Sequence, residues 1–520
     1  MDRLKKFYLN GILMTAVTLI IRYVSVNFNI YISNRIGAVS MGIFTLVSSV
    51  YGFALTIATS GINLATTKLV SEAMGIGSSR QNYNTRATVS AIMKKSLLFS
   101  LSISSFTAII LFLSSSFIGN NILGDQRTVS SLQILAFSLP AIAISSSLCG
   151  YFTALRRVYK NAFVQMFAQG LRIYLCVILL SSTVAKDMES ACVAIVIGIT
   201  ASEIVSFLLQ ALLFYLERRK QRSVCNIPHD KKLTKQLLPI TLPVAFSAYM
   251  RSALITVEHL LIPWGLERSG ASRDISLAAY GTVHSVVFPL VLFPSAISSS
   301  FAGLLVPEIS ESNAAGDNER IARIISRVLK TVLIYSVGTA AIMMSLSAEL
   351  GTVLFPASDA ALYIALIAPL IPIMYLDTSV DSILKGLGYQ FYSMVVNIAD
   401  ASMSVLLVWI LLPRFGIFGY IITVYFTEIV NATLSVTKLL CVTKTKVKIF
   451  DWIAKPILCA IASTSIMKML LNLTHLSQPT GFSLFICILF VAISYLLLLV
   501  LFHAISPKDI KRSILNFIKK

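Results

Sequence analysis

The sequence has few charged side chains and little histidine for its length. Charged residues make up only 13% of 520 residues, and there are 5 histidines, whereas soluble domains carry about 25% charged residues. The 7 cysteines form no CxxC and no Cys/His spacing suited to zinc. No Walker sequence, GxSxG motif or HExxH motif is present. These absences argue against a soluble domain and against the common nucleotide-binding, hydrolase and metalloprotease sites, and the sequence predicts no cofactor.

Apolar residues are abundant and arranged in long runs. They make up 56% of the chain, the mean hydropathy is +0.81, and runs such as Leu97–Leu113 and Ser483–Phe502 carry no charge. A helix needs roughly 20 residues to cross about 30 Å of hydrocarbon. The first stretch, 7–32, is too long for a signal-peptide core and has no small-residue cleavage site, so it is predicted to be a retained span. The sequence therefore predicts a multi-pass membrane protein.

Short polar segments divide the apolar sequence into fourteen predicted spans, all helical. Spans two and eight are long, which indicates tilt or extension beyond the bilayer. Prolines are concentrated in spans seven and eight, where kinks are expected. The predicted boundaries are 7–33, 41–71, 88–117, 129–155, 161–183, 190–216, 236–264, 275–307, 324–347, 360–386, 390–412, 417–438, 453–473 and 482–504.

The Lys and Arg residues are distributed very unequally between the two predicted faces. Of the 43 basic residues, 33 lie at the termini, in the even-numbered loops or at the adjoining span ends, six lie in the opposite loops, and four lie within spans. By the positive-inside rule, both termini are cytoplasmic, and we predict a bacterial inner-membrane location. The net charge of +20 then belongs mainly to one membrane face, so nucleic-acid binding is not predicted.

The first and second halves of the chain carry similar features in the same order. Arg22 and Arg251 each follow a basic helix start, 229 residues apart, and Glu72 and Glu308 end spans two and eight, 236 residues apart. Because six spans preserve orientation, we predict two parallel six-helix bundles around a central cavity, plus two C-terminal helices. The predicted divisions are 1–216 and 236–440 for the bundles, 217–235 for a basic linker, 441–507 for the extra helices and 508–520 for an amphipathic interfacial tail.

A dozen ionisable residues fall inside the predicted spans. A charge at a helix centre costs about 2.5–3.5 kcal/mol on insertion scales, so most of these groups must face a cavity, pair with one another or lie near an interface. The sequence does not determine whether Asp400 and Glu428 pair with Lys468 or with Arg172. The twelve are Arg22, Arg172, Glu203, Arg251, Glu258, His259, His284, Asp377, Asp381, Asp400, Glu428 and Lys468.

Arg22 and Arg251 are the candidate substrate-binding residues. Each lies more than four helical turns from its basic cytoplasmic start, and the repeat predicts equivalent places in the two halves. Arginine stays charged and binds phosphate oxygens with a planar fork, so two of them suit a pyrophosphate. The alternative is that one or both reach the outer interface.

Three acidic residues are candidates for ion or proton coupling. Asp377 and Asp381 lie four residues apart and so share a helix face, where two like charges favour a shared proton. The alternative for them is a helix cap near the break that Pro369 and Pro372 predict. Glu258 precedes His259 and is a candidate for relaying a proton, although His259 also fits a hydrogen-bonded interior residue.

Four segments resemble the stage V sporulation protein B family. They are Phe7–Leu13, Tyr31–Gly37, Ser60–Glu72 and the LKGLG turn at Leu384–Gly388. The chain is identified by them as a member of the polysaccharide-transport branch of the multidrug/oligosaccharidyl-lipid/polysaccharide exporter superfamily, with lipid II flippases and O-antigen translocases as relatives. Asn63 stands where the family often has proline, which leaves the kink of span two open.

The resemblance implies two N-shaped six-helix bundles around a central cavity and a role in spore cortex peptidoglycan synthesis. It also implies that arginines on the first helix of each half, here Arg22 and by the repeat Arg251, bind the phosphates of the substrate. The expected partners are an undecaprenyl-pyrophosphate-linked sugar, the lipid bilayer and cell-wall or spore-cortex synthesis enzymes.

The sequence therefore predicts a flippase, not an enzyme, that carries a lipid-linked sugar such as lipid II from the cytoplasmic to the outer face by alternating access. The first alternative is a cation-coupled multidrug exporter of the same fold, although the basic pair favours an anionic substrate. A membrane polymerase or acyltransferase would need a large outer loop, and the predicted outer loops are short. A scaffold without transport is a further alternative.

Overall fold

The computed structural model describes residues 2–79, 85–181, 188–219, 232–298, 309, 312–313, 317–355, 359–445, 450–473, 481–502 and 504. Within these ranges every regular element is a helix and no strand occurs. The all-α prediction is confirmed. Helices suit a membrane-spanning chain because they satisfy the backbone polar groups within each segment. The tail 508–520 lies outside the described residues, and its predicted interfacial helix stays a prediction.

Helix α1 (Asp2–Thr59) joins predicted spans one and two without a loop. The helix is kinked at Gly37, whose φ of 80° and ψ of 168° are not helical. A second interruption follows at Ser60–Gly61, where Gly61 has a φ of 77°, and α2 (Ile62–Ser79) continues beyond it. Positive φ is accessible to glycine because it has no Cβ. Span two is therefore interrupted at Gly61 even though Asn63 replaces the proline common in the family.

The structure has two compact units. One comprises Ile12–Ile21 and Ile43–Leu261, and the other comprises Met1–Gly11, Arg22–Gly42 and Ile262–Lys520. We call them the 43–261 unit and the 262–520 unit. Helices α1 and α8 (Lys232–Arg268) each contribute to both units. The predicted domain divisions at 216, 236 and 440 stay predictions.

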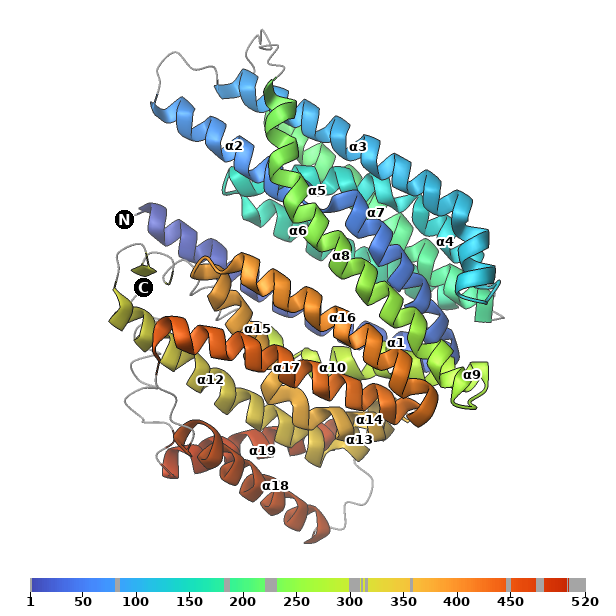
Figure 1. The fold of residues 1–520 in the computed structure, drawn as a ribbon, viewed down its shortest axis with the longest axis vertical. Coiled ribbons are helices and arrows are strands. Elements are labelled where there is room, and N and C mark those ends of the chain that lie inside the picture. The colour runs from blue at the N-terminus through green and yellow to red at the C-terminus, as the bar shows by residue number, and fades with distance from the viewer. Residues whose placement is uncertain are drawn as a thin grey trace. The chain divides into compact units, whose positions relative to one another are not determined.

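In the 43–261 unit, α5 packs against α2, α3 and α7, and α6 packs against α7 (Figure 1). Predicted span four is two helices separated at Phe137, three residues before Pro140. The remaining helices of this unit are α3 (Thr85–Phe117), a π-helical turn (Ile118–Ile122), α4 (Thr128–Ala136), α5 (Ser138–Ala154), α6 (Val158–Ser181) and α7 (Met188–Arg219).

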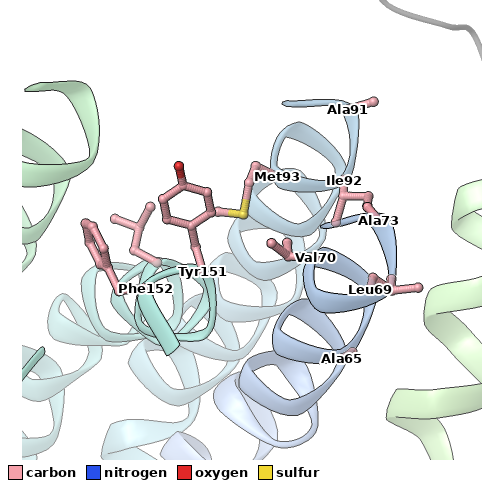
Figure 2. Packing of buried hydrophobic residues seen from close by; sticks show 10 residues of the cluster. Ala65, Leu69, Val70, Ala73, Ala91, Ile92, Met93, Tyr151 and Phe152 are labelled. Carbon is pink, nitrogen blue, oxygen red and sulfur yellow. The ribbon is translucent and has the colours of Figure 1, made fainter. Parts of the chain in front are cut away.

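A hydrophobic cluster joins the helices α2, α3 and α5. Figure 2 shows Leu69 and Val70 from α2, Met93 from α3, and Tyr151 and Phe152 from α5 in one group. Tyr151 packs edge-on against the ring of Phe152, with 5.5 Å between the centroids. Small residues of the same cluster let the helices approach closely, as is typical of membrane helix packing. This cluster fixes the relative positions of three helices of the 43–261 unit.

In the 262–520 unit, α15 packs against α12 and α17, α16 packs against α17, and α18 packs against α12 and α19 (Figure 1). The phenolic oxygen of Tyr495 on α19 donates a 2.8 Å hydrogen bond to the carbonyl of Ile334. The helices are α9 (Arg273–Gly281), a π-helical turn (Thr282–Val287), α10 (Phe288–Leu292), α12 (Asn318–Ser345), α13 (Ser347–Leu354), α14 (Ala360–Ile367), a 3-10 turn (Ala368–Leu370), α15 (Ile371–Gly386), α16 (Gln390–Phe415), α17 (Ile417–Thr443), a π-helical turn (Phe450–Ala454), α18 (Lys455–Leu473) and α19 (Gly481–Leu501).

Twelve of the described helical stretches are long and apolar enough to cross a membrane, which supports a multi-pass membrane protein. The predicted number of fourteen is not confirmed. One stretch, Ala16–Met74, covers predicted spans one and two together. Helix α8, which corresponds to predicted span seven, is not among the twelve, and its charged residues Arg251, Glu258 and Glu267 lower its hydropathy.

Candidate functional site

A helix break in the 262–520 unit has three backbone carbonyls that accept hydrogen bonds from side-chain hydroxyls. Helix α10 ends at Leu292, and Phe293–Pro294 form a turn, called here the 293–294 break. Proline has no backbone N–H, so it cannot complete the ladder of an α-helix. The hydroxyl of Tyr375 donates to the carbonyl of Val291 at 2.6 Å, and that of Tyr335 donates to the carbonyl of Pro294 at 3.1 Å. The prediction of a kink in span eight is confirmed at Pro294.

The same break is held from α12 and α15 by a pair of tyrosine rings. Tyr335 lies on α12 and Tyr375 on α15, and their rings are stacked with 6.3 Å between centroids. Tyr375 is fully buried. Ser295, just after the break, donates its hydroxyl to the carbonyl of Leu292 at 2.7 Å. Buried side chains with satisfied hydrogen bonds fix the backbone of the break in one conformation.

Arg22 and Tyr23 of α1 contact this break. The Nη1 of Arg22 lies 3.4 Å from the Oγ of Ser295, and the ring centroids of Tyr23 and Phe293 are 6.1 Å apart. Both side chains on α1 are exposed. Among the described residues, Arg22 forms no ion pair with a carboxylate. Arg22 therefore carries a positive charge that has no carboxylate partner among the described residues and that makes a weak hydrogen bond to a hydroxyl group.

Arg251 is an exposed residue of α8 in the 43–261 unit. Its neighbours in sequence hold α8 against α1 by polar contacts. Ser252 donates to the Oγ1 of Thr56 at 3.1 Å, and Tyr249 donates to the carbonyl of Ile57 at 3.2 Å. No carboxylate among the described residues pairs with Arg251. Each of the two predicted substrate-binding arginines is therefore exposed and has no carboxylate partner among the described residues of its own unit.

The third arginine of the predicted spans is neutralised. Arg172 on α6 forms an ion pair with Glu203 on α7, through its Nη2. The sequence left Asp400 and Glu428 open as partners of Arg172, and the structure pairs Arg172 with Glu203 instead. Pairing with an opposite charge lowers the cost of holding a charge inside a membrane protein. Arg172 thus has a carboxylate partner, whereas Arg22 and Arg251 have none among the described residues.

Asp377 and Asp381 lie on one face of α15 but have different partners. The Oδ2 of Asp377 accepts a 3.3 Å hydrogen bond from Asn431 on α17. Asp381 is paired with Lys385, one turn along the same helix, at 2.5 Å. Neither residue caps a helix start, since both lie well inside α15. The structure therefore gives Asp381 a cation and gives Asp377 a polar partner on a neighbouring helix.

Two further carboxylates accompany Asp377 in the 262–520 unit. Glu428 on α17 is within electrostatic range of Asp377 on α15 and Asp400 on α16. The sequence places Asp400 and Glu428 inside predicted spans but does not associate them with Asp377. The signal that could have found them is the short separation along the chain of spans ten to twelve, which makes neighbours of their helices. Glu258, the remaining coupling candidate, is half-buried on α8 in the other unit.

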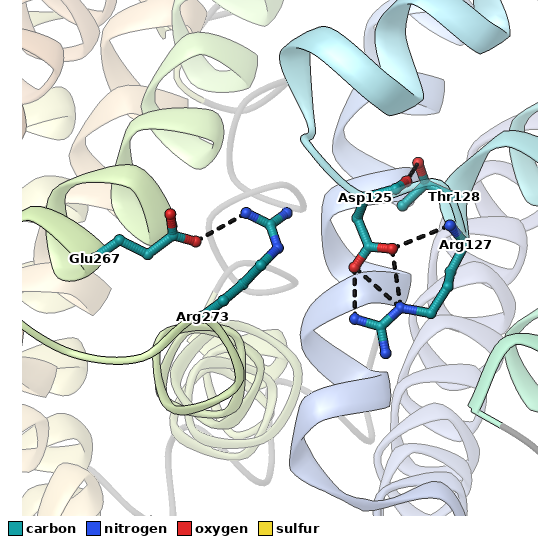
Figure 3. A network of polar contacts seen from close by, with 5 residues as sticks. All are labelled: Asp125, Arg127, Thr128, Glu267 and Arg273. Carbon is teal, nitrogen blue, oxygen red and sulfur yellow. Dashed lines mark hydrogen bonds and ion pairs between the residues drawn. The ribbon is translucent and has the colours of Figure 1, made fainter.

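Charges at the helix ends are paired locally. In one loop, Asp125 accepts hydrogen bonds from the backbone and guanidinium of Arg127, at 3.0 Å and 2.7 Å, and its carbonyl accepts from Thr128 (Figure 3). In another, Arg273 is 2.9 Å from Glu267 (Figure 3). These arginines are two of the six basic residues in the predicted outer loops, and each is neutralised by an acid of the same unit.

The fold is one that solved multi-pass membrane transporters share. The structure resembles that of the lipid II flippase MurJ in an inward closed conformation, with a TM-score of 0.69 and 13% identity over 95% of this chain and 99% of that chain. It also resembles an inward-facing multidrug resistance MATE transporter, with a TM-score of 0.61 and 14% identity over 82% and 96% of the two chains.

The chain belongs to the polysaccharide biosynthesis protein family, whose sequence profile matches residues 8–313. The profile of the MatE family matches residues 270–410. Among relatives, stage V sporulation protein B of Bacillus subtilis (strain 168) is 23% identical over 517 residues, which cover 98% of both chains. The uncharacterized membrane protein YabM of the same organism is 23% identical over 77% of this chain and 74% of its own.

Proposed function

We propose that the protein is a flippase that moves an undecaprenyl-pyrophosphate-linked sugar, of the lipid II type, from the cytoplasmic to the outer face of the bacterial inner membrane. The similarity to stage V sporulation protein B supports a place in spore cortex synthesis. In this proposal both termini are cytoplasmic, and enzymes that make or consume the lipid-linked sugar are the expected partners. Alternating access of two six-helix halves carries the headgroup across.

The observation that carries the proposal is the state of Arg22. Its guanidinium is exposed, it lies within a stretch predicted to span the membrane, and its contact is a hydroxyl of Ser295 at 3.4 Å. A charge held there without a carboxylate costs free energy, which an anionic ligand would offset. Phosphate oxygens match the planar fork of arginine. Arg251 has the same features on α8, and we propose that both residues bind phosphate oxygens of the substrate.

We propose further that carboxylates take part in ion or proton coupling. Of the three sequence candidates, Asp377 has the most supporting surroundings because Glu428, on α17, interacts electrostatically both with it and with Asp400. Three carboxylates in one region strongly disfavour full ionisation of all of them. Asp381 is the weaker candidate since Lys385 already compensates its charge. Glu258 remains a candidate in the 43–261 unit.

The test is a flipping assay with the purified protein in liposomes. Fluorescent lipid II is placed in the inner leaflet, and its arrival outside is followed with an enzyme or quencher confined to the exterior. We expect transport by the wild type and its loss in Arg22→Ala and Arg251→Ala, with Arg268→Ala as a control for loss of an exposed arginine on α8. Transport that persists in both variants would disprove the phosphate-binding role and leave the flippase intact.

A second candidate function is cation-coupled multidrug export, because the MatE profile matches residues 270–410. That function predicts export of organic cations driven by an ion gradient. Exposed, unneutralised arginines disfavour a cationic ligand by like-charge repulsion. The two functions separate in one experiment: liposomes are given lipid II or a fluorescent cationic dye, with and without a sodium or proton gradient. Dye transport without lipid II transport would replace the flippase by the exporter.

A further inference from the structure

We propose that Tyr23 and Phe293 form an aromatic subsite for the sugar ring attached to the phosphates of the substrate, next to the phosphate-binding guanidinium of Arg22. This inference rests on the proposed flippase function and adds to it the part of the substrate that is recognised. It assigns sugar recognition to two rings of the 262–520 unit, one on α1 and one at the 293–294 break.

The geometry brings a cation and two aromatic rings to one place. Arg22 and Tyr23 are consecutive on α1, and they contact the two sides of the break, Ser295 and Phe293 respectively. The rings of Tyr23 and Phe293 are 6.1 Å apart with an interplanar angle of 52°. The side chain of Tyr23 is 59% exposed. A ring this accessible leaves a face open for a ligand beside the guanidinium.

The break is rigid enough to serve as one wall of a binding site. Tyr375 and Tyr335 donate hydrogen bonds to carbonyls on either side of Phe293, those of Val291 and Pro294. Both tyrosines come from other helices of the same unit, α15 and α12. Binding groups that are held by a shell of packed and hydrogen-bonded residues keep their geometry. Tyr335 and Tyr375 are therefore positioning residues for the ring of Phe293 and the hydroxyl of Ser295.

The chemistry of a glycosyl pyrophosphate matches this arrangement. Its first sugar is bonded through the anomeric oxygen to phosphorus, so a pyranose ring always lies directly beside the phosphates. The C–H groups on one face of a pyranose form an apolar surface that packs on an aromatic ring. Ligand sites commonly combine aromatic walls with a few placed polar groups. Arg22 and Ser295 supply the polar groups here, and Tyr23 and Phe293 supply the wall.

A lipid-facing anchor is the competing role for an exposed tyrosine in a membrane helix, since tyrosines are enriched where helices meet the headgroups. The proposal differs from that role in what it predicts for ligands. A sugar subsite distinguishes a glycosylated pyrophosphate from one without sugar, whereas an anchor treats the two alike. The comparison of these two ligands is therefore the decisive measurement.

The experiment measures displacement of fluorescent lipid II from the purified full-length protein in detergent. The competitors are unlabelled lipid II and undecaprenyl pyrophosphate, which has no sugar. The variants are Tyr23→Leu and Phe293→Leu. The matched controls are Tyr174→Leu on α6, another exposed tyrosine, and Phe99→Leu on α3, another half-buried phenylalanine. Thermal unfolding of each variant verifies that it is folded, and Tyr23→Phe provides a conservative change that keeps the ring.

We expect both aromatic variants to bind lipid II roughly tenfold more weakly while undecaprenyl pyrophosphate binds as in the wild type. Arg22→Ala weakens both ligands, and Tyr23→Phe restores lipid II binding. Unchanged lipid II affinity, or an equal loss for both ligands, would overturn the subsite and leave the flippase standing. A wild type that binds neither ligand and moves no lipid II would contradict the flippase itself.

Discussion

The phenolic oxygen of Tyr375 lies 2.6 Å from the carbonyl oxygen of Val291, and this hydrogen bond ties α15 to the helix break beside Arg22. Tyr375 is fully buried, and its ring stacks on Tyr335, which binds the carbonyl of Pro294. The carbonyl of Pro294 also accepts from the backbone N–H of Ile297 at 3.2 Å. A broken helix in a membrane must satisfy its carbonyls from within the protein, and the two tyrosine hydroxyls contribute to this. The local sequence alone does not hold the break.

Tyr375→Phe removes that hydroxyl and keeps the ring. Loss of a buried hydrogen-bond donor costs about 1–3 kcal/mol, so the midpoint of thermal unfolding in detergent should fall. Because the break positions Ser295 and Phe293, transport of lipid II should fall as well. Tyr174→Phe, at an exposed position of α6, is the control and should behave as the wild type. An unaltered midpoint in Tyr375→Phe would show that the break is stable without this bond.

Glu217→Gln tests a clasp at the end of α7. The carboxylate of Glu217 is buried and pairs with Arg157 and with Lys160, whose Nζ is 2.5 Å from Oε2. The substitution keeps the shape but leaves two cations without a counter-charge. We expect a loss of about 3 kcal/mol, at the low end for a broken buried pair because Arg157 is partly exposed.

Chemical or thermal unfolding of the purified protein measures this loss. The matched control is Glu72→Gln, which breaks a pair with Lys68 at 3.9 Å whose side chains are both about half exposed. Exposed pairs contribute roughly 0–1 kcal/mol, so the control should change little. Equal effects of the two substitutions would mean that the clasp at Glu217 is no stronger than a surface pair.

Arg172 and Glu203 give a test of whether an intramembrane charge serves structure or substrate. Either single substitution, Arg172→Leu or Glu203→Leu, leaves one partly buried charge without its partner and should lower expression and stability strongly. The double substitution removes both charges, and a buried pair replaced by apolar residues is often tolerated. We therefore expect the double variant to recover stability and lipid II transport, measured in the liposome assay. A double variant that is stable but inactive would give this pair a role in transport.

The sequence predicted the helices well, but it did not predict which faces of neighbouring helices pack together. Hydropathy runs delimit the spans because each must bury its backbone in lipid, and glycine and proline mark where α1 kinks and where α10 ends. The partner of Arg172 was not predictable because periodicity shows which residues share a helix face, not which neighbouring helix they meet. For the same reason, the sequence did not predict that Glu428 interacts with both Asp377 and Asp400. The roles of Tyr335 and Tyr375 required the tertiary structure.

Gly42→Ala should destabilise the 262–520 unit because α1 and α9 cross there almost in backbone contact. A Cβ on Gly42 would lie 2.1 Å from the carbonyl oxygen of Leu277, and a Cβ on Gly281 would lie 2.4 Å from the backbone nitrogen of Gly42. The atoms that would be struck are backbone atoms, which cannot rotate away as a side chain can. Forcing atoms into a packed interior costs about 1–3 kcal/mol or more.

Gly52→Ala on the same helix is the matched control because a Cβ there would meet nothing within 4 Å. Alanine is favoured over glycine inside a helix by about 0.5–1 kcal/mol, so this control should be neutral or more stable than the wild type. Thermal unfolding in detergent should therefore rank the proteins Gly52→Ala, wild type, Gly42→Ala, from most to least stable. If Gly42→Ala unfolds with the wild type or above it, the close crossing of α1 and α9 is not present in the folded protein.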